Sequence, residues 1–166
     1  MKVLFIVPEI RLASNPIHAP FWAGILAAIV EQKGGQVGIL DLNALRTKYG
    51  EQQVPSQIII DEISSEKWDM IGIGGLTTTY GRIKELSPII RKYAPQSLFI
   101  GGGGWSTYNP QEILHLVPEM DLMVREKKHL GNYMIKLKII LKILMMLMGY
   151  VLEMKNLDSN LQIHEL

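Results

Sequence analysis

Residues 69–80 read DMIGIGGLTTTY and residues 97–105 read SLFIGGGGW, and these two stretches decide the fold. Each starts as an apolar strand pattern and ends in glycines, and an amphipathic helical pattern over residues 80–93 joins them. Two parallel strands joined by a helix form a βαβ unit, whose ligands bind outside the carboxyl ends of the strands. Glycines at those ends let a ligand approach the backbone closely. We therefore predict a binding edge made by the two loops.

The rest of the chain alternates in the same way between strand and helix patterns. Strands are expected at 3–7, 36–42 and 121–124, and helices at 23–33, 56–67 and 109–116, while residues 44–55 look polar and irregular. On the helix over residues 80–93, the charged side chains, Arg82 included, are expected mostly on the outside. Such alternation predicts an α/β fold with a parallel sheet and right-handed crossovers.

Composition narrows the class of protein. A chain of 166 residues is long enough for one domain with a real core, and its net charge of +1 gives no bulk attraction for nucleic acid. The absence of cysteine excludes disulfides, thiolate-held zinc and a cysteine-ligated iron–sulfur cluster within this chain. The apolar start ends at Pro8-Glu9, so it predicts a core strand rather than a signal peptide, and we expect a cytoplasmic location.

The glycine-rich loops have more than one chemical interpretation. Tight packing at strand ends explains glycine without any ligand. A dinucleotide fingerprint needs G-x-G-x-x-G, but Thr77 stands where the third glycine belongs, and no Walker lysine follows. The hydroxyls of residues 77–79 suit a phosphate, an amide or a ribose. Asp41, at the end of the second strand, is suited to bind either a ribose hydroxyl or a loop amide. Trp105 either stacks against a ligand or belongs to the core.

Taken together, several short runs resemble the cobalamin-binding domain at the N-terminus of cobalamin-dependent radical-SAM enzymes. The resemblance covers roughly residues 2–124. Its runs are VP at 7–8, RLAS at 11–14, HAP at 18–20, DLNA at 41–44, and the glycine-rich stretches at 69–80 and 101–105.

This resemblance implies a flavodoxin-like, three-layer α/β fold with a five-stranded parallel sheet in the order 2-1-3-4-5. Cobalamin would lie across the carboxyl ends of the strands, with its nucleotide tail between the loops of the third and fourth strands. The implied cofactor contacts are Gly74, Gly75, Leu76, Thr77, Thr78, Thr79, Tyr80, Gly101, Gly102, Gly103, Gly104 and Trp105, together with Ser14, His18 and Asp41. The D-x-H-x-x-G motif that supplies a protein ligand to cobalt is absent after the first strand. The lower ligand of cobalt would then be water or absent, or it would be His18, the nearest histidine, which otherwise serves as a loop residue that helps to cap the next helix.

The resemblance stops at Val124, which divides the chain into a domain over 1–124 and a basic, apolar tail over 125–166. In the family a radical-SAM barrel with a C-x-x-x-C-x-x-C motif comes next, but this chain has no cysteine. S-adenosylmethionine and the iron–sulfur cluster are therefore expected only in a full-length parent enzyme. We expect no catalysis from this chain alone. One hypothesis is that the tail is translated out of frame. The other is a genuine basic and apolar helix that binds a partner or a membrane surface, although its apolar run over residues 139–152 is too short for a membrane span.

The function predicted from the sequence is cobalamin binding, as a truncated or stand-alone domain of a radical-SAM methyltransferase-type enzyme whose barrel would be the partner. The alternative is a nucleotide- or sugar-nucleotide-binding domain of a transferase. A receiver-like interaction module is disfavoured, because Glu9 has no neighbouring acid with which to hold magnesium.

Overall fold

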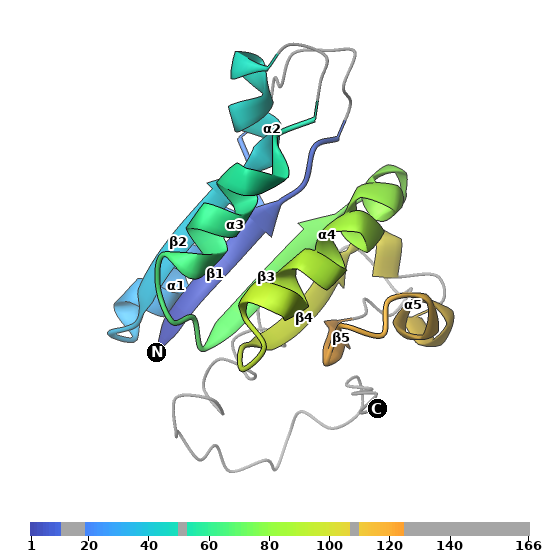
Figure 1. Ribbon diagram of the computed structural model, residues 1–166. Helices are drawn as coiled ribbons and strands as arrows, with labels where there is room; N and C mark the ends of the chain where they lie inside the picture. The colour runs from blue at the N-terminus through green and yellow to red at the C-terminus, as the bar shows by residue number, and fades with distance from the viewer. Residues whose placement is uncertain (11–18, 50–52, 107–109, 125–166) are drawn as a thin grey trace, which may run out of the picture.

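A single parallel sheet organises the computed structural model, which describes residues 1–10, 19–49, 53–106 and 110–124. Its strands are β1 (Lys2–Val7), β2 (Gln36–Asp41), β3 (Met70–Gly75), β4 (Leu98–Gly103) and β5 (Leu122–Val124). They pair in the order β2-β1-β3-β4-β5, all in parallel (Figure 1). The predicted fold class and strand order are confirmed.

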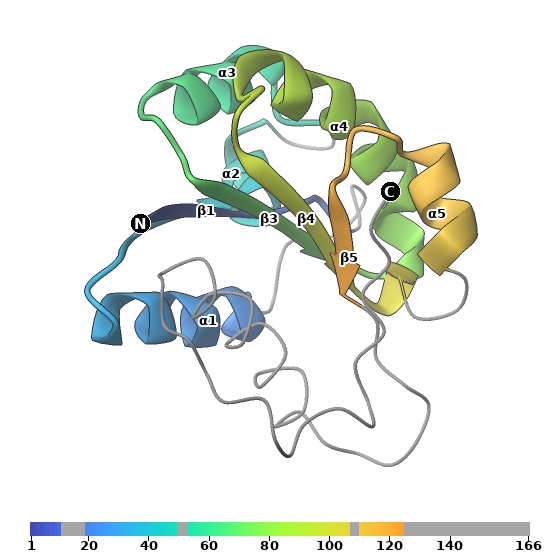
Figure 2. The same ribbon diagram turned by 90° about the horizontal axis from the view of Figure 1, so that it is seen from below.

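Helices cover both faces of the sheet. Figure 2 shows α1 (Phe21–Gln32) alone beneath it, and α3 (Ser56–Ser64), α4 (Tyr80–Tyr93) and α5 (Pro110–Leu116) on the opposite side. Right-handed crossovers require this division. The chain crosses the sheet in one direction from β1 to β2, and in the opposite direction from β2 to β3, β4 and β5. The strand order therefore reverses between β1 and β3, which makes this pair the switch point of the sheet.

Two apolar layers hold the helices to the sheet. On the α1 face, Phe5, Met70 and Ile100 pack with Leu26 and Val30. The opposite face carries the larger cluster, to which α3, α4 and α5 contribute Ile59, Ile63, Ile83, Leu86 and Leu114. Because successive side chains along a strand point to opposite faces, each strand contributes side chains to both layers, as expected for a sheet buried on both sides.

The structure corrects some of the expected elements. Residues 44–55 are not wholly irregular, because α2 (Leu42–Leu45) and a short 3-10 helix, η1 (Arg46–Lys48), occupy the first part. The helix expected over 56–67 ends at Ser64. The prediction that Arg82 lies outside is wrong: its side chain is only 9% exposed, because it pairs with Glu9. Among the described residues, no helix is long and apolar enough to cross a membrane.

Candidate functional site

The two glycine-rich loops lie side by side at the carboxyl edge of the sheet. Register pairs Gly74 with Gly102 and Gly75 with Gly103. Beyond these residues, β3 continues into a 3-10 turn, η2 (Thr77–Thr79), and β4 continues into η3 (Gly104–Ser106). A side chain added at Gly103 would place its Cβ 2.5 Å from the Gly75 carbonyl oxygen. The close approach of the loops therefore requires glycine at position 103.

Several of the predicted contact residues face the protein's own interior. Thr79 is buried, and its hydroxyl donates to the Leu76 carbonyl at 2.7 Å. A Cβ at Gly75 would collide with that hydroxyl. Trp105 is buried as well: its indole N–H donates to the Gly102 carbonyl at 2.7 Å, and its ring fills the space next to Gly101. These residues shape the two loops from within.

Other members of the predicted set remain open. Thr77 and Thr78 are exposed, and Leu76 is 52% exposed. A Cβ at Gly104 would meet its nearest neighbour, Leu76 Cδ2, at 3.6 Å, which is an ordinary contact. A ligand can therefore reach two hydroxyls, an apolar side chain and bare backbone along one rim of the edge.

Tyr80 supplies a further polar atom. It is the first residue of α4, and its ring lies 6.3 Å from that of Trp105 between centroids. Its hydroxyl is buried and makes no hydrogen bond with any residue that the structure describes. An unsatisfied buried hydroxyl is costly, so this oxygen is suited to a polar atom of a ligand or to an ordered water.

The α1 face of the same edge is occupied by an aromatic ring. A Cβ at Gly74 would lie 2.8–3.1 Å from ring atoms of Trp22, which also packs edge-on against Phe5 at 6.0 Å between centroids. Gly74 thus makes room for Trp22. The sequence did not single out this contact, although the period of two along β3 places Gly74 on the face where α1 packs.

The remaining candidates lie apart from the two loops. Asp41 ends β2, and its carboxylate accepts from the Ala44 N–H at 3.0 Å, so it caps α2. Because β1 separates β2 from β3, Asp41 is not adjacent to the β3 loop. Ser14 and His18 lie outside the described residues. Among the described residues, no three His, Asp or Glu side chains come together as a metal site.

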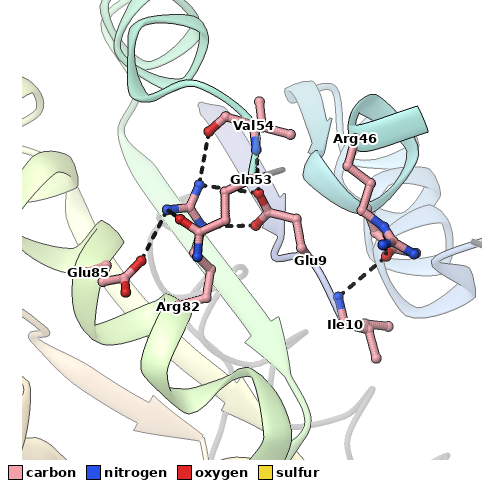
Figure 3. Close-up of polar contacts among 8 residues, drawn as sticks. Glu9, Ile10, Arg46, Gln53, Val54, Arg82 and Glu85 are labelled. Carbon is pink, nitrogen blue, oxygen red and sulfur yellow. Dashed lines mark hydrogen bonds and ion pairs between the residues drawn. The ribbon is translucent and has the colours of Figure 1, made fainter. Parts of the chain in front are cut away.

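A buried ion pair beside the β3 loop is a structural feature that the sequence analysis missed (Figure 3). Arg82 Nε donates to Glu9 Oε2 at 2.9 Å and Nη2 donates to Oε1 at 3.2 Å. Glu9 directly follows β1 and Pro8, and Arg82 lies in the first turn of α4. A carboxylate placed directly after a buried strand was the available signal, but its partner lies 73 residues away.

The fold and site define an α/β domain that presents strand-end loops to a ligand. A B12-binding domain family model matches residues 10–130, so the chain belongs to the B12-binding domain family. Comparison with curated protein sequences finds no significant match.

Solved structures with the same fold include two radical-SAM enzymes. One is the methyltransferase TsrM from Kitasatospora setae with cobalamin and a 4Fe-4S cluster bound (TM-score 0.65, 19% identity, 89% of this chain and 26% of that one). The other is the cobalamin-dependent S-adenosylmethionine radical enzyme OxsB (TM-score 0.58, 14% identity, 99% of this chain and 22% of that one). A carbohydrate esterase from Corynascus thermopiles also matches (TM-score 0.52, 10% identity, 89% and 66%). The chain spans about a quarter of the length of each radical-SAM enzyme.

The residues at the strand edge fit a cobalamin. A bulky nucleotide tail with amide and phosphate groups needs bare backbone and a few hydroxyls. Gly104 offers bare backbone, and Thr77, Thr78 and Tyr80, whose hydroxyl has no partner among the described residues, offer hydroxyls.

Proposed function

We propose that this chain holds cobalamin against the β3 and β4 loops, as the cofactor-binding domain of a radical-SAM enzyme of methyltransferase type. Membership of the B12-binding domain family supports the ligand. The observation that carries the location is the accessible rim at Gly104, Thr77 and Thr78, directly beside the close contact between Gly75 and Gly103.

Each residue of the rim has a defined task in this proposal. Gly104 gives the nucleotide tail access to bare backbone, and Thr77 and Thr78 bond its polar atoms. The buried Tyr80 hydroxyl forms a hydrogen bond with the ligand, and Leu76 covers an apolar part of the ligand. Gly75, Thr79, Gly101, Gly103 and Trp105 hold the loops in place without touching the cofactor.

The chemistry of the whole enzyme belongs elsewhere. When bound, cobalamin supplies a cobalt centre that can carry a methyl group. S-adenosylmethionine and an iron–sulfur cluster would be held by a radical-SAM barrel, as a further domain or a separate subunit, since this chain has no cysteine. The same lack of cysteine is consistent with the reducing cytoplasm, where we place the protein.

Retention of hydroxocobalamin tests the proposal. The purified protein is incubated with the corrin, free ligand is removed by gel filtration, and the visible spectrum is recorded. We expect a retained, roughly stoichiometric corrin spectrum. If a protein that is folded by circular dichroism retains none, while equilibrium dialysis shows that it binds a nucleotide or nucleotide sugar, the transferase alternative replaces cobalamin.

A further inference from the structure

The Glu9–Arg82 pair lies at the place where the strand order of the sheet reverses. Glu9 follows β1 and Arg82 follows β3, and these two strands flank the switch point. Open α/β sheets bind ligands in the crevice at this point. The pair is therefore buried beside the ligand edge, with side-chain exposures of 9% for Arg82 and 2% for Glu9.

Arg82 uses its guanidinium to tie separate segments together (Figure 3). Besides Glu9, it donates to the Val54 carbonyl at 3.1 Å and to the side chains of Gln53 and Glu85, each at 3.2 Å. These contacts account for all five N–H groups of an arginine. The Glu9 carboxylate in turn accepts from the Val54 N–H at 3.0 Å. One ion pair thus joins the chain after β1, the connection from β2 to α3, and the start of α4.

A second contact fixes the same end of β1 from the other side. The Ile10 N–H donates to Asn43 Oδ1 at 3.3 Å, and Arg46 Nε donates to the same oxygen at 3.2 Å. Asn43 and Arg46 are both buried. The chain that leaves β1 is therefore held between α2 and α4 before it enters the loop toward α1.

Stability alone does not explain the burial of this pair. Taking two charges out of water is costly, and a buried ion pair is weak support for a fold compared with apolar side chains of similar volume. What a bidentate arginine–carboxylate pair does provide is fixed geometry. A binding site needs such geometry, because its contacts depend on loops held within a fraction of an ångström.

We propose that Glu9 and Arg82 are positioning residues that hold the chain directly after β1, the connection before α3 at Val54 and the start of α4 in the arrangement that cobalamin binds. This inference rests on the proposed function. The pair acts through the loops and sets the affinity for the cofactor. Arg82 lies in the first turn of α4, two residues after Tyr80, so the pair also fixes the start of this helix.

The test compares the double variant Glu9→Gln/Arg82→Gln with wild type. The amide at position 9 keeps an acceptor for the Val54 N–H, and the net charge is unchanged. We expect the dissociation constant for hydroxocobalamin to rise about tenfold or more, with a thermal midpoint close to that of wild type. Arg82→Lys is the second variant, because it keeps the positive charge but loses the planar guanidinium that makes the bidentate contact with Glu9. We expect it to weaken binding about threefold or more.

Helix α4 offers a matched control at the other edge of the sheet. Near its carboxyl end, Arg91 Nη2 pairs with Asp121 Oδ2 at 2.8 Å, and Asp121 also accepts from the Phe99 N–H. The double variant Arg91→Met/Asp121→Asn removes this pair while keeping an acceptor for Phe99. We expect its affinity for hydroxocobalamin to equal that of wild type.

Hydrogen exchange without ligand separates positioning from general loosening. In Glu9→Gln/Arg82→Gln, amides at the ligand edge, such as those of Ile10, Val54 and Thr79, should exchange about tenfold faster. The amides of Asp69 and Leu98, at the opposite edge, should not change. Equal cofactor affinity in wild type and in the variants, or a uniform rise in exchange, overturns the inference and leaves the proposed function standing. Failure of wild type to bind the corrin overturns the proposed function itself.

Discussion

Gly103 and Gly104 are neighbours in the chain, yet the structure gives them opposite tasks. Gly103 has φ of +106°, a conformation that L side chains rarely adopt, and an alanine there costs about 1–2 kcal/mol for the backbone alone. Its Cβ would also lie 2.5 Å from the Gly75 carbonyl oxygen. That oxygen belongs to the backbone, so relief requires opening the last β3–β4 pair, for about 1 kcal/mol. Gly103→Ala should therefore destabilise the fold by roughly 2–3 kcal/mol.

Gly104 has room for a Cβ by comparison, because its described neighbours lie at ordinary contact distance. The nearest atom to an added Cβ is 3.6 Å away, so Gly104→Ala should change the free energy of unfolding by no more than about 0.5 kcal/mol. A larger side chain, as in Gly104→Leu, would project over the rim where we place the cofactor. We expect this variant to fold normally and to bind hydroxocobalamin about tenfold more weakly, a loss of about 1.4 kcal/mol.

Thermal and urea denaturation followed by circular dichroism measures the first effect, and corrin titration measures the second. The expected fall in the melting temperature of Gly103→Ala is roughly 4–12 °C. A Gly103→Ala protein as stable as wild type would refute the account of the loop contact. A Gly104→Leu protein that binds the corrin as tightly as wild type would refute the placement of the cofactor on this rim.

Three further predictions concern Trp22, Tyr80 and the reading frame after codon 124. Trp22→Ala should destabilise the protein by about 2–3 kcal/mol, because the ring covers Gly74 and Phe5; Gly74→Ala should cost less in that background than in wild type, which a double-mutant cycle of urea denaturation measures. Tyr80→Phe should leave the ligand-free protein as stable or about 1 kcal/mol more stable, because it removes an unsatisfied hydroxyl. The same change should weaken corrin binding in a titration, and unchanged affinity would show that the ligand does not use this oxygen. Finally, genomic DNA downstream of codon 124, read in a neighbouring frame, should lead into a cysteine motif if the tail is out of frame, and the absence of one contradicts that hypothesis.

The sheet was predictable because its signals are local. Continuous apolar runs at β1 and β3 mark strands buried on both faces, and the alternation with helical patterns selects parallel pairing. Adjacent loops at one edge then follow from topology alone. The B12-binding domain family was also within reach of the sequence, since its short runs keep their order over most of the chain.

The division of labour within the glycine-rich loops was not predictable in the same way. Glycine is required where the protein's own atoms approach, as at Gly74 and Gly103, and it is also required where a ligand approaches. Sequence alone does not separate these causes. The packing partners do, because Trp22 and the Gly75 carbonyl already occupy the space at two of these positions, whereas no described residue lies that close to a Cβ at Gly104.

Charged residues on a helix pose the same difficulty. Arg82 and Arg91 both lie in α4, and periodicity assigns both to its polar side. At the opposite edge, Arg91 and Asp121 hold helix to sheet with side chains that are 28% and 41% exposed, so the attachment does not require a buried charge. At the ligand edge, Arg82 and Glu9 are almost fully buried and join three connections. Because the same helix shows that the exposed arrangement suffices for attachment, the deeper burial of Arg82 needs a separate cause. The fixed placement of the strand-end loops provides one.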